Sequence, residues 1–135
     1  MLDTNVLSAV MHAEGRVVAW LDEQPRTSIW TTAISIFETR YGLLAMPAGR
    51  RRIERENAFF RLIEEKLERR VLPFDEAAAE QTAALMDLRR RAGRTGEIRD
   101  TMIAGIVVAQ NATLATRNVR HFDDLQVPVI DPWEG

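Results

Sequence analysis

The stretch IRDTMIAGIVVAQNATLATRN, residues 98–118, decides the fold. Apolar residues follow Asp100 at the third, fourth, seventh and eighth positions, which is the spacing of one face of an α-helix. Residues 113–116 are then short, largely apolar and rich in threonine, as is typical of a strand. A helix that leads directly into a strand is the repeating unit of an α/β protein.

The same alternation runs through the whole chain. Segments that favour strands lie at residues 27–31, 71–74, 113–116 and 128–130, with the stub of an earlier strand at 1–2. Segments that favour helices lie at about 16–24, 33–47, 50–70, 76–92 and 98–111. This order predicts right-handed crossovers and a three-layer α/β/α sandwich around a mostly parallel sheet of four to five strands. Ligands of such sheets bind at the carboxyl ends of strands, so polar residues just past a strand end are the candidates for a site.

Length and composition indicate one ordinary globular domain over residues 1–135. The chain has 135 residues, of which 46% are hydrophobic and 28% charged. Its net charge of −2 excludes a global positive field, so any polyanion must be bound by a local basic patch. Only Lys66 among the 18 basic residues is a lysine. The 17 arginines fit bidentate phosphate contacts, and they fit GC-rich codon usage equally well.

The residue types that are missing narrow the chemistry. Without cysteine, the chain has no disulfide, no thiolate metal site and no thiol nucleophile, which fits a reducing compartment. Asp3 and Asn5 interrupt the start, so we expect no signal peptide. The longest apolar run, residues 106–109, is far shorter than a membrane span of about 18 residues. We therefore expect a cytoplasmic protein with no membrane contact.

Two carboxylates lie where a solvated side chain is not expected. Asp3 follows the apolar Leu2 and opens a polar cluster that suits either a helix N-cap or an ion ligand. Glu38 falls on the helical face marked by Ile34 and Tyr41, where a carboxylate is costly unless it is paired. The alternative for Glu38 is a position at the edge of the stripe, reaching solvent or an arginine.

A third carboxylate and a polar turn repeat this pattern. Asp100 heads the apolar stripe of its helix, and its alternatives are an interaction with the helix dipole or an ion pair with Arg94 or Arg99. Residues 116–118 follow the strand at 113–116, where plain turn chemistry is the alternative. If these segments share one end of a parallel sheet, three neighbouring carboxylates cannot all stay ionised without a counter-charge. Oxygen ligands alone favour Mg²⁺ or Mn²⁺, which would activate water and stabilise charge on a phosphodiester.

Other chemistries have less support. Two histidines are too few for a typical zinc site and have no nucleophile-elbow sequence beside them. Neither a dinucleotide-binding glycine motif nor a P-loop occurs.

Four segments resemble the successive motifs of the PIN-domain ribonucleases, and above all the toxin component of VapBC-type toxin–antitoxin systems. They are LDTNVLS at 2–8, SIFETRYG at 35–42, RDTMIAGI at 99–106 and ATRNVRHF at 115–122. The resemblance covers nearly the whole chain in the expected order. It implies a metal-dependent endoribonuclease that cleaves RNA, is usually a homodimer and is silenced by a small VapB-type antitoxin. Both tRNA and rRNA are candidate substrates, and the sequence does not choose between them.

The resemblance also assigns roles to residues. Asp3, Glu38 and Asp100 match the acidic triad that holds Mg²⁺ or Mn²⁺ and positions the attacking water. The supporting and substrate positions are Thr4, Asn5, Thr116 and Arg117.

Two departures from the family pattern bear on the site. Asn118 stands where many relatives have a fourth aspartate, so it takes a secondary role and a second ion binds more weakly unless Asp123 or Asp124 reaches in. The segment before Asp3 is also shorter than in relatives, so the first strand is short or the natural start lies upstream.

The surface gives weaker signals. For RNA the candidates are Arg117 and the arginine clusters at 50–55 and 89–94, although such runs are usually solvated helix faces. Five apolar residues are candidates for an antitoxin groove or a dimer surface: Leu43, Leu44, Met46, Phe59 and Phe60. The alternative is that they pack in the core. Two rival functions remain open: a PIN nuclease without an antitoxin, including a DNA-directed one, and a catalytically weak binding module.

Overall fold

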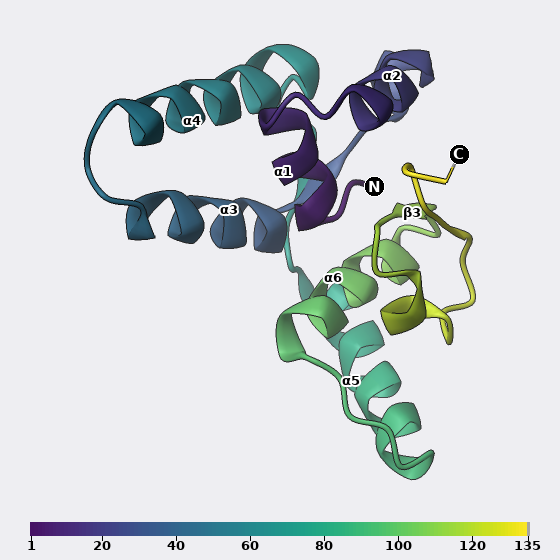
Figure 1. Cartoon of the computed structure of the whole chain (residues 1–135). Helices are drawn as coiled ribbons and strands as arrows, with labels where there is room; N and C mark the ends of the chain where they lie inside the picture. Colours follow the sequence, from purple (N-terminus) through teal and green to yellow (C-terminus); the bar gives the residue numbers. More distant parts are fainter. Residues whose placement is uncertain (135) are drawn as a thin grey trace.

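The computed structural model describes residues 1–134 and places a small parallel sheet between two groups of helices (Figure 1). The strands are β1 (Thr31–Thr32), β2 (Val71–Leu72), β3 (Leu114–Ala115) and β4 (Val129–Ile130). Leu2 makes parallel bridges to Thr31 and Ala115 and so takes the central position. The order across the sheet is β2, β1, Leu2, β3, β4, and every pairing within residues 1–134 is parallel.

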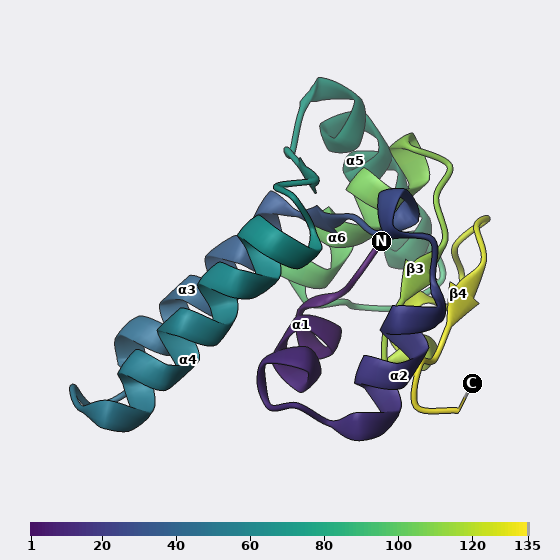
Figure 2. The same ribbon diagram turned by 90° about the horizontal axis from the view of Figure 1, so that it is seen from above.

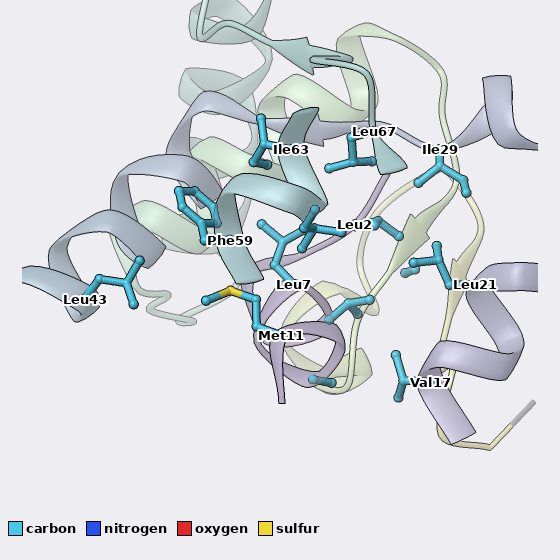
Figure 3. Close-up of a cluster of buried hydrophobic side chains, with 14 residues drawn as sticks. Leu2, Leu7, Met11, Val17, Leu21, Ile29, Leu43, Phe59, Ile63 and Leu67 are labelled. Carbon is cyan, nitrogen blue, oxygen red and sulfur yellow. The ribbon is translucent and has the colours of Figure 1, made fainter. Parts of the chain in front are cut away.

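Helices cover both faces of the sheet. They are α1 (Thr4–Met11), α2 (Gly15–Glu23), α3 (Ala33–Ala45), α4 (Arg50–Arg61), α5 (Glu76–Arg91) and α6 (Ile98–Ala109). Leu2 and Ala115 pack into a core with α1, α2 and α4, in which Leu7 and Phe59 are also buried (Figure 3). Leu114 points to the opposite face and packs with α5 and α6. Because neighbouring residues of a strand face opposite sides, this split confirms the expected three-layer α/β/α sandwich.

Helix α6, which carries Asp100, lies unusually close to α5. A Cβ atom added to Gly105 would lie 1.9 Å from Thr82 Oγ1 and 2.7 Å from the carbonyl oxygen of Ala78. Only glycine fits this crossing, and the tight contact fixes the position of α6 against the sheet.

The α3–α4 hairpin extends away from the rest of the molecule (Figure 2). Leu43 of α3 and Phe59 of α4 are buried in the same core cluster. For these two residues the alternative of core packing is therefore confirmed. Leu44 and Phe60, however, are exposed, so core packing is wrong for these two. Met46 is half-buried against the first core.

The largest differences from the expected elements are three. The strand expected at 27–31 is replaced by a 3₁₀ turn, Arg26–Ser28, followed by β1, because the Arg70 side chain donates to the carbonyl oxygens of Arg26 and Ile29. The helix expected at 50–70 ends as α-helix at Arg61 and continues as a π-helical turn over residues 62–66. Helix α1 was not expected as an element of its own.

No helix within residues 1–134 combines the length and the apolar character that crossing a membrane requires.

Candidate metal and nucleic-acid site

Asp3 lies at the carboxyl end of the central strand, at the point where the chain order across the sheet reverses. Its neighbours β1 and β3 lead to crossovers on opposite sides, and this arrangement opens a crevice at the strand ends. The residue is 3% exposed. Its Oδ1 accepts a hydrogen bond from the Thr4 backbone N–H at 2.7 Å, and its Oδ2 accepts one from the Thr116 hydroxyl at 2.6 Å. Asp3 is therefore the N-cap of α1, and hydrogen bonds hold both of its carboxylate oxygens.

The electrostatic state of Asp3 links it to the other two carboxylates. Burial raises the pKa of Asp3, and the hydrogen bonds from Thr116 and Thr4 lower it again in part. The negative charges of Asp100 and Glu38 raise this pKa further. Ionisation of Asp3 is therefore less favourable than in water, and a cation bound near it would oppose this effect.

Glu38 reaches the same edge from α3 through a short chain of hydroxyl groups. Its Oε1 accepts a hydrogen bond from the Thr4 hydroxyl at 2.7 Å, and Ser35 Oγ lies 3.0 Å from that hydroxyl oxygen. The Glu38 side chain is 18% exposed, and Arg99 Nε lies 3.7 Å from its Oε2. Arg40 turns away from Glu38 and stacks on the Phe59 ring. The structure thus makes Arg99, on α6, the arginine beside Glu38.

Asp100 occupies the first turn of α6. Its side chain is 24% exposed, and its Oδ2 lies 3.3 Å from His121 Nδ1. The alternative of an ion pair with Arg94 is not observed, because Arg94 lies 3.0 Å from Asp123. Arg99 pairs with Glu97 at 3.0 Å rather than with Asp100.

The Thr116 hydroxyl is the hub of the polar network behind Asp3. This residue is fully buried, and its oxygen accepts hydrogen bonds from the Asn5 amide at 3.3 Å and from the Asn118 backbone N–H at 3.1 Å. The Asn5 side-chain oxygen in turn accepts from the Arg117 backbone N–H at 3.2 Å. Thr4, Asn5 and Thr116 therefore orient the carboxylates, and Asn118 is tied into the network by its backbone.

Sequence reasoning missed two members of this network. Ser35 lies one helical turn before Glu38 and so shares its face, but the sequence pattern of residues 35–42 assigns it no role. His121 was set aside for lack of a partner nucleophile, yet the structure places it against Asp100. The two aspartates considered as replacements for a fourth carboxylate do not turn to the site, because Asp124 pairs with Arg89 at 2.8 Å and Asp123 with Arg94.

The donor set of this edge suits a hard divalent cation, since it consists of carboxylate, hydroxyl and amide oxygens. The carboxylate oxygens face their own hydrogen-bond partners, however. Within residues 1–134, no three acidic, histidine or cysteine side chains gather closely enough to hold one ion as they stand. Asp3, Glu38 and Asp100 thus lie at the same edge of the sheet, and the charges of Glu38 and Asp100 act on Asp3. Joint coordination would require the three carboxylates to move closer together, and the hydrogen bond from Thr4 leaves oxygen lone pairs of Glu38 free for an ion.

Fold and site together define an α/β protein with an acidic centre at the switch point of a parallel sheet. The family model of the PIN domain matches residues 1–127. The chain belongs to the PIN domain family.

Three similar proteins are informative. The VapC ribonuclease Y4jK of Sinorhizobium fredii is 38% identical over 136 residues, which cover 99% of this chain and 97% of the relative. The toxin FitB of Neisseria gonorrhoeae is 30% identical over 98% of this chain and 97% of its own length. A solved structure of FitAB bound to the IR36 DNA fragment superposes with a TM-score of 0.87 at 30% identity, covering 98% of this chain and 94% of that one.

Proposed function

We propose that this protein is the toxin of a type II toxin–antitoxin pair, acting as an endoribonuclease that hydrolyses phosphodiester bonds in RNA. The names of the relatives support this function, since one is a VapC ribonuclease and another a toxin. One observation carries the catalytic part. The carboxylate of Asp3 is buried at the sheet's switch point, and the charges of Asp100 and Glu38 raise its pKa. Such a centre costs folding free energy unless it binds a cation.

Asp3, Glu38 and Asp100 are the residues we propose to hold Mg²⁺ or Mn²⁺. A bound divalent cation supplies Lewis-acid stabilisation of the phosphodiester and lowers the pKa of a coordinated water. The hydroxyl groups of Thr4 and Thr116 fix the orientation of two of these carboxylates. Thr116 thereby prepares Asp3 for coordination without touching the substrate. Asn118, whose backbone N–H donates to Thr116, is the residue we propose for a secondary role through its neutral amide oxygen.

The partner we propose is a VapB-type antitoxin. The solved FitAB complex supports this pairing for the relative. On this chain, Phe37, Tyr41 and Leu44 form an exposed stripe along α3, each more than half exposed. Apolar residues three, four and seven positions apart on a helix suit an amphipathic partner helix. A homodimer, which the family resemblance implies, stays a proposal that the oligomeric state in solution tests.

The first experiment is cleavage of a mixed tRNA and rRNA pool by the purified protein with Mg²⁺, with Mn²⁺ and with EDTA. We expect discrete fragments that depend on metal and disappear in Asp100→Asn. Asp87→Asn is the matched control, because Asp87 is an exposed carboxylate paired with Arg90 and Arg91. Folded, antitoxin-free protein that yields no fragments under any condition would favour a binding module. Fragments that persist in Asp100→Asn would contradict the assigned centre.

A further inference from the structure

The arginines of this chain divide into two groups by their ionic partners. Eleven of the seventeen lie within 4.0 Å of a carboxylate oxygen. Within residues 1–134, the arginines without such a partner are Arg16, Arg51, Arg55, Arg61, Arg117 and Arg120. An unpaired guanidinium keeps its full charge and its donor fork for an external anion.

Two of the six line a groove that ends at the acidic centre. This groove has a volume of about 530 Å³ and is lined by residues of α1, α3 and α4. Figure 1 shows the arrangement of these three helices. Thr4 and Glu38 line it at the acidic centre, and Arg51 and Arg55 line it from α4. Arg55 is held in place by a hydrogen bond to the carbonyl oxygen of Met11, at the end of α1.

Two more follow β3, on the other side of the acidic centre. Arg120 lines a pocket of about 170 Å³ together with Asp100 and His121. Arg117 stacks its guanidinium on the Trp133 ring, 4.8 Å from the ring centroid, and its backbone is tied to Asn5. Four of the six unpaired arginines thus flank the carboxylates on two sides.

The remaining arginine clusters behave differently. Arg50 and Arg52, on the same helix as Arg51, pair with Glu54 at 3.4 Å and with Glu56 at 3.0 Å. Every arginine of the cluster at 89–94 has an aspartate partner. Of the two clusters in the sequence, only part of the first therefore keeps cations free for a ligand.

We propose that Arg51 and Arg55 on one side, and Arg120 on the other, bind phosphates of a single RNA strand on either side of the acidic centre. This inference rests on the proposed function and names the path of its substrate. The strand enters along the groove between α1, α3 and α4, passes Thr4 and Glu38, and leaves by the pocket beside Asp100. A phosphodiester backbone matches this layout because it offers one anion at the centre and further anions on both flanks.

The experiment measures binding of a fluorescein-labelled unstructured RNA to the Asp100→Asn protein over a range of salt concentrations. In that background, Arg51→Ala with Arg55→Ala should weaken binding about tenfold, since charge-assisted hydrogen bonds are lost. The plot of log affinity against log salt should become shallower by about 1.4, or about 0.7 for each lost phosphate contact. Arg120→Ala should remove about 0.7 from the same slope.

The matched control is Arg50→Ala with Arg52→Ala, which also removes two charges from α4, leaving Glu54 without its arginine and Glu56 with Arg40 alone. We expect it to weaken binding less than the first pair, and circular dichroism confirms the fold of each variant. Equal weakening by both pairs, or none, overturns the inference. So does a loss of affinity for the co-expressed antitoxin with unchanged affinity for RNA, because the groove then belongs to the antitoxin. Metal-dependent RNA cleavage by the natural protein is measured in parallel. If cleavage is present but the arginine variants bind RNA normally, the proposed RNA path is wrong and the proposed nuclease function stands.

Discussion

Two buried polar clusters in this protein are built on opposite principles. Arg89 is 5% exposed and meets Asp124 twice, at 2.8 and 2.9 Å, with further hydrogen bonds to the carbonyl oxygen of His121 and the hydroxyl of Thr101. The hydrogen bond from Arg89 lowers the pKa of Asp124. Asp3 is as deeply buried, yet its partners are neutral and its pKa is raised.

The difference shows which cluster serves the fold and which serves a ligand. The Arg89 cluster is balanced in charge and ties α5 to the segment after β3, so it needs nothing from outside. The Asp3 cluster gathers three carboxylates, and within residues 1–134 no arginine, lysine or histidine side chain pairs with Asp3 itself. Binding of a cation would compensate the cost of this arrangement. Arg99 and His121 stand at its rim rather than at its centre.

The largest effect is expected from breaking the balanced cluster. Arg89→Ala should lower the free energy of unfolding by about 3–5 kcal/mol, because it leaves the half-buried Asp124 carboxylate without its main partner. Urea denaturation measures this loss. Its control is Arg90→Ala, whose side chain is 74% exposed, with an expected change within about 0.5 kcal/mol. Equal losses in the two variants would mean that the Arg89 pair has no special weight.

The acidic cluster should respond in the opposite way. In EDTA at neutral pH, Asp3→Asn should not lower the unfolding free energy, because it removes an anion that burial and two neighbouring carboxylates disfavour. Mg²⁺ at a hundredfold excess over its Kd should add about 2.7 kcal/mol to the natural protein and nothing to the variant. Thermal unfolding with and without Mg²⁺ tests both statements. If Mg²⁺ still stabilises Asp3→Asn, the ion binds at another site.

Sequence patterns predicted the parts of the fold that rest on local signals. Helices α3 and α6 were expected within two residues of their observed ends, because each has a continuous apolar face, and Pro47 limits α3. Helix α1 was not predicted, because the residues of its first turn also suit a polar turn. The burial of Val6 and Leu7 that stabilises this helix depends on tertiary packing.

The site was only partly accessible to the same reasoning. The strand-end rule selected Asp3, and helical spacing selected Glu38 and Asp100. The contact between Thr4 and Glu38 joins residues 34 positions apart, and no local pattern encodes it. Nor does any pattern say that Arg89, among 17 arginines, makes two hydrogen bonds to Asp124.

A moderate effect of pH should separate the clusters further. The folded-state pKa of Asp124 lies below its unfolded value, so its contribution to stability is complete above the unfolded pKa of about 3.9 and disappears as pH falls through the lower folded pKa. Asp3 has the opposite sign, because its raised pKa means that protonation favours the folded state.

Denaturation in EDTA between neutral and acidic pH measures this contrast. The advantage of the natural protein over Asp124→Asn should shrink as the solution becomes acidic. Where the natural protein has a lower unfolding free energy than Asp3→Asn, that difference should also shrink as the solution becomes acidic. Parallel pH profiles for the natural protein and Asp124→Asn would show that the pair with Arg89 does not shift the titration of Asp124.

The smallest effects should come from one hydroxyl in each cluster. Thr101→Val removes one of the hydrogen bonds of Arg89 and leaves the others, so we expect a loss of about 1 kcal/mol in stability and unchanged RNA cleavage. Thr116→Val should cost about 1–3 kcal/mol, because Asn5 and the Asn118 backbone lose their acceptor. Only this second variant removes a donor from Asp3, so it alone should raise the Mg²⁺ concentration needed for half-maximal cleavage. An equal rise in both variants would mean that loss of packing, rather than the orientation of Asp3, governs the metal requirement.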